Sequence, residues 1–274
     1  MTALISIAIP DSMFLDDDSL REKTVKVGQI ARSAAIFGVE RVYIYRDSSR
    51  NYDSDFDTAR NIFHYAETPQ YLRRRLVGKK RELEFVGLLP PLRTPHHLKD
   101  AQPKIEEIRE GVTLMHNGKL VVDIGAREFA KFEFRGQEGQ RVTVKMLSLS
   151  PLTVEPAQKP EGVYWGYEVR RAPSLARFLR SANFELMILT SRLGVSVDRV
   201  WNEFCGNCSR ASKILVCFGS PTSGVDRMLA QDSAKVTDFK AMYLNMFPSQ
   251  NVETIRLEEA ILGSLSILNL AVRL

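Results

Sequence analysis

The period of hydrophobic and polar positions changes twice along the chain, and each change marks a different kind of structure. Residues 4–9 are an apolar run that predicts a buried strand. Ser19 and Glu22 form a capping-box pattern, after which apolar residues recur at helical spacing until Gly38. A second strand is predicted over residues 42–45. This strand–helix–strand unit is typical of a parallel sheet with right-handed crossovers.

The middle of the chain alternates with a period of two. A helix is predicted over about 57–76, and residues 111–149 then alternate between apolar and polar positions around the hairpin signal Asn117-Gly118. The apolar positions include Ala130, Phe132, Phe134, Val142, Val144 and Met146. Short strands joined by tight turns predict a small closed barrel, most simply of the OB type, over residues 92–163. Phe129 lies on the opposite parity and is a candidate for stacking on a nucleobase.

After the barrel, the α/β pattern resumes. The sequence predicts strands over 164–170, 186–189 and 214–218, a short helix beginning at Pro173, and helices over 195–204 and 254–270. The predicted fold is therefore α/β, with one mostly parallel sheet formed by residues 1–91 and 164–274. The barrel is an insertion into this discontinuous domain.

Composition narrows the range of partners only slightly. The 274 residues carry a formal charge of +5, which permits nucleic acid as a partner without requiring it. Six cations lie within nine positions and are a candidate RNA-binding cluster: Arg73, Arg74, Arg75, Lys79, Lys80 and Arg81. A solvated helix end would explain the same cluster without any function.

The cysteines and the apolar runs bear on compartment and metal. Cys205, Cys208 and Cys217 are too few and odd in number for a disulfide framework, which favours a cytoplasmic protein. The Cys205–Cys208 spacing is half of a zinc site without a second half, so we expect no metal. No apolar run is long enough to span a bilayer, and the N-terminus lacks the features of a secretion signal.

Three segments with small, polar or turn-forming residues follow predicted strands in the last third of the chain. They cover residues 190–194, 219–224 and 245–254. Ligands collect at the carboxyl ends of parallel strands, and glycine lets them approach the backbone, so the three segments predict one shared pocket. None of them matches a phosphate-binding or dinucleotide-binding motif.

The order of these segments resembles the SPOUT class of RNA methyltransferases. The resemblance is carried by residues 245–260, NMFPSQNVETIRLEEA, by residues 214–224, ILVCFGSPTSG, and by residues 189–194, LTSRLG. It is closest to a branch of archaea and eukaryotes in which an OB-type domain interrupts the α/β fold. The middle segment departs from the Gly-x-Glu-Gly of several bacterial relatives.

The resemblance implies a trefoil knot, the cofactor S-adenosylmethionine, an RNA substrate and a homodimer. The implied cofactor-binding residues are Thr190, Ser191, Gly194, Gly219, Ser220, Gly224, Asn245, Met246, Phe247, Pro248, Val252 and Thr254. Arg256 is the best catalytic candidate, because it could hold the target base or phosphate and stabilise negative charge. Glu259, Asn251 and Ser220 are weaker positioning candidates.

Simpler explanations exist for several of these residues. Thr254 could be only the N-cap of the last helix, and Arg256 and Glu259 could form an ordinary surface ion pair. The last helix is apolar over more than one face, which agrees with burial by a second subunit but also with burial in one chain. The motif around Arg256 is similar to that of bacterial enzymes that methylate uridine N3 in ribosomal RNA. The alternatives are 2′-O-methylation of tRNA or rRNA, and a non-catalytic RNA-binding or ribosome-assembly protein.

Overall fold

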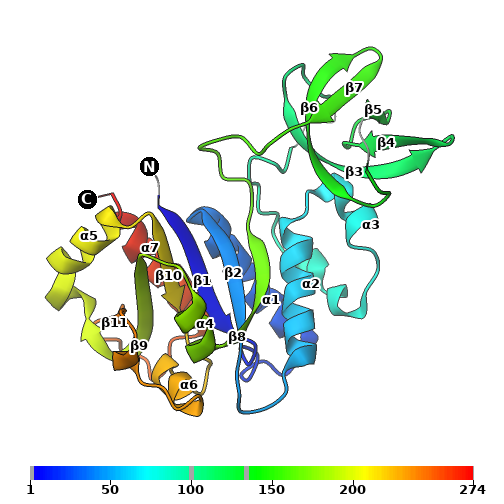
Figure 1. Cartoon of the computed structure of the whole chain (residues 1–274). Helices are drawn as coiled ribbons and strands as arrows, with labels where there is room; N and C mark the ends of the chain where they lie inside the picture. The colour runs from blue at the N-terminus through cyan, green and yellow to red at the C-terminus, as the bar shows by residue number, and fades with distance from the viewer. Residues whose placement is uncertain (1–2, 99–101, 133–135, 274) are drawn as a thin grey trace. The chain divides into compact units, whose positions relative to one another are not determined.

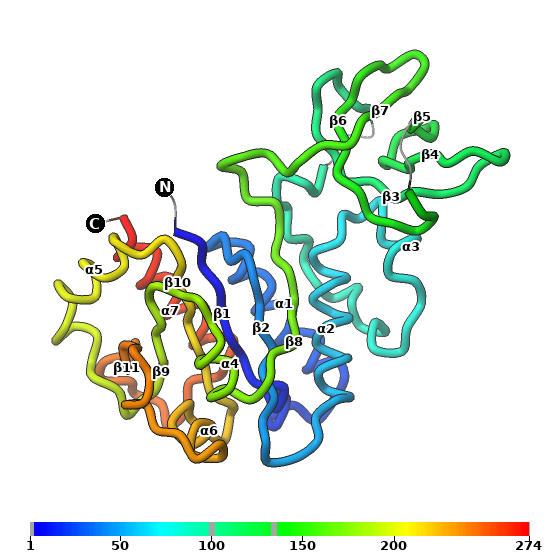
Figure 2. Tube along the Cα trace, in the orientation of Figure 1, coloured from blue at the N-terminus to red at the C-terminus, as the bar shows by residue number. Residues whose placement is uncertain are grey.

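The computed structural model describes residues 3–98, 102–132 and 136–273. Its contacts divide the chain into two compact units, which we call the α/β unit (Met1–Phe63 with Tyr167–Leu274) and the barrel unit (His64–Gly166). Figure 2 follows the chain from the first part of the α/β unit through the barrel unit and back again. By their contacts, residues 64–91 belong to the barrel unit, which is thus longer than the predicted insert.

The α/β unit is built on one parallel sheet with helices on both faces (Figure 1). Its elements are β1 (Leu4–Pro10), α1 (Leu20–Ile36), β2 (Val39–Arg46), α2 (Asp53–Glu67, whose residues 64–67 belong to the barrel unit), β8 (Glu168–Ser174), α4 (Leu175–Ser181), β9 (Leu186–Ser196), α5 (Trp201–Arg210), β10 (Lys213–Cys217), α6 (Val225–Gln231), β11 (Met242–Asn245) and α7 (Leu257–Ala271). The strand order is β11-β9-β10-β1-β2-β8, and each neighbouring pair runs parallel. The prediction that one parallel sheet closes from both sides of the barrel is confirmed, because β2 pairs with β8.

Burial on both faces of the sheet explains why its strands are continuous apolar runs. Ile7 and Ala8 of β1 are adjacent in sequence, point to opposite faces and are both fully buried. α4 and α6 pack on the face to which Ala8 belongs, and Figure 1 draws α1 and α7 on the other side of the sheet. The predicted capping box also forms, since the Glu22 amide donates to Ser19 Oγ at 3.2 Å and the Ser19 amide donates to Glu22 Oε2 at 2.9 Å.

Several predicted boundaries in the α/β pattern are wrong. The helix over 57–76 is interrupted, because α2 ends at Glu67 and Pro69 has no amide to continue it. A 3₁₀ turn (Gln70–Leu72) and the short helix α3 (Arg73–Leu76) follow. The strand over 164–170 is shifted to β8. Pro173, predicted to begin a helix, lies in this strand at a register shift on the sheet edge, where proline is tolerated, and α4 begins at Leu175. The helix over 195–204 is shifted to α5, because Val195 pairs with β11 as a strand residue.

The barrel unit contains the closed barrel that the period-two pattern predicted. Its strands are β3 (Ile108–His116), β4 (Lys119–Asp123), β5 (Ala130–Phe132), β6 (Arg141–Leu149) and β7 (Leu152–Pro156), in the closed order β3-β4-β5-β7-β6. The β3–β4 turn has positive φ at Asn117 (50°) and Gly118 (74°), as a type I′ hairpin requires. Phe132, Val144 and Met146 lie in the barrel core. Phe134 lies outside the described residues.

A buried polar network joins five segments of the barrel unit. Arg141 donates to both Glu67 carboxylate oxygens at 2.6 and 3.0 Å and to Glu110 at 2.6 Å. The Trp165 indole donates to Glu110 at 2.6 Å, and His96 Nε2 lies 3.1 Å from Glu67 Oε1. Burial acts to raise the pKa of Glu67, but hydrogen bonds from His96 and Arg141 outweigh it and lower this pKa to about 2. The ionised form of Glu67 therefore stabilises the folded unit.

No helix in the described part of the chain has the length and apolar character needed to cross a membrane. No group of three or more histidine, cysteine, aspartate or glutamate side chains is arranged to hold a metal ion among those residues.

Candidate functional site

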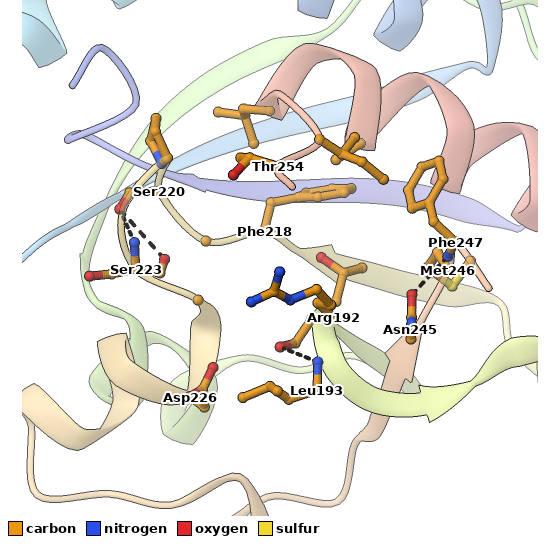
Figure 3. Close-up of a pocket in the computed structure, with 18 of the residues that line it drawn as sticks. Arg192, Leu193, Phe218, Ser220, Ser223, Asp226, Asn245, Met246, Phe247 and Thr254 are labelled. Atoms are coloured by element: carbon orange, nitrogen blue, oxygen red, sulfur yellow. Dashed lines mark hydrogen bonds between the residues drawn. The ribbon is translucent and has the colours of Figure 1, made fainter. Parts of the chain in front are cut away.

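A pocket of about 340 Å³ lies at the carboxyl ends of β9, β10 and β11, which are neighbours in the sheet (Figure 3). In the β9–β11 register, Leu189 lies opposite Tyr243 and Val195 lies opposite Leu244, the next residue of β11. Residues 190–194 therefore form a bulge that has no partners in β11. The three predicted segments therefore meet at one site. Nine of the predicted cofactor residues line it: Thr190, Ser191, Gly219, Ser220, Gly224, Asn245, Met246, Phe247 and Thr254.

Two glycines allow the pocket loops to approach other backbone closely. A Cβ at Gly194 would lie 2.5 Å from the Leu244 carbonyl carbon and 2.8 Å from the Asn245 nitrogen. A Cβ at Gly219 would lie 2.4 Å from the Ser223 carbonyl oxygen. Both contacts are shorter than real Cβ contacts, so larger residues would force the loops apart.

Polar groups fix the conformations of the loops around the pocket. Thr190 Oγ1 donates to the Cys217 carbonyl at 2.8 Å and so ties the first loop to the end of β10. The Ser220 amide donates to the Ser223 carbonyl at 2.8 Å, and the Ser223 amide donates back to Ser220 Oγ at 3.0 Å. Arg192 Nη1 donates to the Glu253 carbonyl at 3.2 Å, and Figure 3 places its guanidinium between the glycine loop and the C-terminal loop.

The pocket combines an apolar wall with a few polar groups, as small-molecule sites do. Phe218, Met246 and Phe247 supply apolar surface, and Asp226 supplies a carboxylate. Ser264 of α7 also lines the pocket; it is 1% exposed, and its hydroxyl has no hydrogen-bond partner among the described residues. A buried hydroxyl of this kind is costly unless a ligand or water satisfies it.

Other predicted site residues lie outside the lining. Gly194, Pro248 and Val252 are absent from it, as are the catalytic candidates Arg256, Glu259 and Asn251. The last three are exposed. Helix α7 begins after Arg256, whose amide donates to Glu259 Oε2 at 3.0 Å, so Thr254 is not its N-cap as the simpler explanation supposed.

Four residues that matter for the chemistry of the pocket were not identified from the sequence. Arg192 and Phe218 lie inside or next to the quoted motifs, and their position directly after apolar strands was the available signal. Asp226 and Ser264 lie on α6 and α7, where nothing in the local pattern distinguishes them from ordinary helix residues.

The basic cluster of the barrel unit lies at its surface, where at least two of its side chains contact other residues of the unit. Arg73 donates to the Thr68 carbonyl at 3.1 Å and lies 4.3 Å above the Tyr65 ring. Arg75 binds Asp123 at 2.6 Å. The remaining cations of the cluster are exposed at the surface of the unit: Arg74, Lys79, Lys80 and Arg81.

The fold and the pocket together define an α/β protein with a small-molecule site at the carboxyl ends of three parallel strands, joined to a β-barrel. Residues 4–268 match the family described as "Putative RNA methyltransferase", so the chain belongs to this family of RNA methyltransferases. The sequence-based assignment to RNA methyltransferases is thereby confirmed.

Named relatives agree with this family over nearly the whole chain. The chain is 31% identical to the 28S rRNA (uridine-N(3))-methyltransferase of Drosophila melanogaster, over 96% of this chain and 61% of that protein's length. It is also 31% identical to the protein of the same name from Homo sapiens, over 96% of this chain and 77% of that protein. A solved structure of the putative methyltransferase Lpg2936 from Legionella pneumophila, with bound SAM, matches at a TM-score of 0.43 and 11% identity, which is too low to bear on function.

Proposed function

We propose that this protein is an S-adenosylmethionine-dependent methyltransferase that acts on N3 of uridine in ribosomal RNA. The observation that carries the proposal is the 31% identity, across 96% of the chain, to relatives named as enzymes of this reaction. The chain contains a pocket suited to a cofactor in the segments that the motif resemblance singled out.

The pocket residues fit S-adenosylmethionine in size and chemistry. A volume of about 340 Å³ lies at the lower end of the range for small-molecule sites. The apolar side chains of Met246 and Phe247 suit the adenine, Asp226 suits the positively charged amino group, and the unpartnered Ser264 hydroxyl offers a hydrogen bond. When bound, the cofactor supplies a methyl group on a sulfonium, which is already activated for transfer.

The protein must then position the uridine, whose N3 proton passes to solvent water as the methyl group is transferred. Negative charge develops on the base as that proton leaves, so a guanidinium near the base lowers the barrier. Arg192 lies inside the pocket, and the exposed Arg256 follows the loop that closes it. We assign Arg256 to the RNA and Glu259 to fixing the backbone of Arg256, through the hydrogen bond between them. Asn251 and Ser220 remain positioning candidates.

Three finer features belong to the same proposal. An OB-type barrel is supported by the closed order β3-β4-β5-β7-β6 and by the parallel pairing of β5 with β7. A trefoil knot is supported by the convergence of three loops on one pocket, where Arg192 bonds to the C-terminal loop. A homodimer is supported by apolar side chains left exposed on α7, Leu262 at 45% and Leu270 at 55%.

The barrel unit is the proposed RNA-binding element, with residues 92–163 as its core. Its support is the set of exposed cations Arg74, Lys79, Lys80 and Arg81 on one short stretch of the unit. Binding through phosphate contacts should weaken steeply as salt increases, because counterions are released.

The experiment that tests this proposal is methyl transfer from radiolabelled S-adenosylmethionine to large-subunit ribosomal RNA. Wild-type protein should label the RNA, whereas Gly219→Val should not, because its side chain would collide with the Ser223 carbonyl. The matched control is Gly87→Val, since a Cβ at Gly87 meets nothing within 4 Å. A wild-type protein that binds the RNA but never labels it would favour the non-catalytic alternative.

A further inference from the structure

The barrel unit carries a ladder of three side chains from three different segments. Phe129, just before β5, is half-buried, and its ring centroid lies 5.5 Å from the guanidinium carbon of Arg75 on α3. The ring of His116, at the end of β3, lies 5.2 Å from that of Phe129 with an interplanar angle of 70°. This edge-to-face geometry is one that aromatic pairs favour. The ladder therefore runs Arg75, Phe129, His116.

Both ends of the ladder are held in place by neighbouring groups. Arg75 Nε donates to Asp123 Oδ2 at 2.6 Å, which fixes the guanidinium and offsets the carboxylate charge. Asn117 Nδ2 lies 3.3 Å from His116 Nε2, within the tight β3–β4 turn. Because the His116 ring is already restricted, this side chain loses little further conformational entropy when a ligand stacks on it.

The His116 end of the ladder presents an aromatic ring to solvent. His116 is exposed, whereas Phe129 behind it is half-buried. The exposed Lys119 lies directly opposite His116 in the β3–β4 register, at the tip of the hairpin that Figure 1 labels β3 and β4. A flat ring backed by a second ring and accompanied by a cation suits a planar, negatively charged ligand.

A groove continues from the Arg75 end of the ladder. It has a volume of about 590 Å³ and shares Arg75 with the ladder. The exposed Arg74 lines it, together with two carboxylates, of which Asp123 binds Arg75 and Glu138 accepts a hydrogen bond from the Met115 amide at 3.2 Å. The site thus offers a stacking surface at one end and, at the other, a groove of mixed charge in which the exposed Arg74 can contact a phosphate of the same strand.

We propose that His116 stacks on an unpaired base of single-stranded RNA whose backbone follows Lys119 and Arg74. A base inside a duplex has both faces covered by its neighbours, so an exposed ring selects unpaired nucleotides. The inference rests on the proposed function, which supplies RNA as the ligand, and adds that the barrel unit recognises a single-stranded segment through base stacking. Stacking tolerates any base, so the site holds the strand and does not read its sequence.

The test uses the whole protein and a 12-nucleotide single-stranded oligouridine that carries one 2-aminopurine. Stacking quenches the fluorescence of this base analogue, so the assay reports stacking as well as affinity. Wild-type protein should quench the signal, and His116→Ala should lose the quenching and bind roughly 5- to 100-fold more weakly. His116→Phe keeps a ring and should retain both. Lys119→Ala should weaken binding and reduce its salt dependence while the quenching at saturation remains.

Equal quenching and affinity for wild type and His116→Ala would overturn the proposal. So would a blunt-ended RNA duplex of the same length whose binding loses as much on His116→Ala as the single strand does. Because no methyl transfer is measured, these results are independent of catalysis. A protein that labels ribosomal RNA but shows no dependence on His116 would refute the stacking site and leave the proposed function intact.

Discussion

Glu67→Gln removes the charge from the centre of the buried polar network and should destabilise the barrel unit strongly. Lowering the pKa of Glu67 from 4.5 to about 2 corresponds to about 3 kcal/mol of preference for the ionised form in the folded state, at about 1.4 kcal/mol for each pKa unit. Removing one member of a buried ion pair costs about 3 to 5 kcal/mol. Since Arg141 keeps Glu110 as a partner, we expect the lower end, about 3 kcal/mol.

Tryptophan fluorescence can follow this unit alone. The chain has two tryptophans, and Trp165 lies in the network itself, bonded to Glu110. In a Trp201→Phe background, urea unfolding therefore reports the barrel unit. With a denaturant slope of roughly 1 to 1.5 kcal/mol/M for a unit of this size, the midpoint should fall by at least 2 M. Glu128→Gln, an exposed carboxylate of the same unit, is the control and should leave the midpoint unchanged.

The effect must also depend on pH with a defined sign. The folded-state pKa of Glu67 lies below its ordinary value, so its stabilisation is fully present above pH 4.5 and is lost as pH falls towards about 2. The difference between wild type and Glu67→Gln should therefore shrink steadily as the pH is lowered from 5 to 2. A difference that stays constant over this range, or that equals the difference for Glu128→Gln at pH 7, would refute the reasoning.

Three further predictions concern the α/β unit. Gly194→Ala should weaken S-adenosylmethionine binding at least tenfold by calorimetry, because its Cβ would collide with the β11 backbone. Gly224→Ala should weaken binding less, because the closest contact of its Cβ is the movable Asp226 carboxylate. The opposite order of the two effects would contradict the geometry. Arg256→Ala should lower methyl transfer at least tenfold and leave the cofactor affinity unchanged, whereas Arg192→Ala should change the cofactor affinity as well. If the cofactor affinity falls for Arg256→Ala and not for Arg192→Ala, these assignments are reversed. The double variant Leu262→Lys, Leu270→Lys should be a folded monomer by light scattering, since both side chains are exposed in the single chain. An unchanged oligomeric state would show that this face of α7 is not part of the interface.

The sequence predicts local structure correctly where residues close together in the chain determine the backbone conformation. The Ser19–Glu22 box and the Asn117-Gly118 turn are short-range devices, and both form as predicted. Boundaries failed where tertiary pairing overrides local pattern, as at Val195, which pairs with β11 instead of beginning a helix. The barrel unit's extent could not be predicted, because residues 64–91 join it through long-range contacts such as those of Glu67.

The loops of the candidate site could be predicted from the sequence, but its helical residues could not. The three pocket loops follow apolar strands and contain glycine, which sequence alone reveals, so most of the predicted cofactor residues do line the pocket. Asp226 and Ser264 could not be found, because each is set by which face of a helix turns toward the pocket once the sheet has formed. Arg256 was found through the motif, and its role remains a prediction, since it lies outside the lining.

The central claim is that the chain methylates N3 of uridine, and mass spectrometry of nucleosides tests it most directly. Large-subunit ribosomal RNA lacking the modification is incubated with the protein and S-adenosylmethionine, digested to nucleosides and separated by chromatography before detection. We predict the appearance of 3-methyluridine, which elutes apart from 2′-O-methyluridine of equal mass, and its loss with Gly219→Val but not Gly87→Val. Formation of 2′-O-methyluridine instead, or of no methylated nucleoside by a protein that binds both cofactor and RNA, would contradict it.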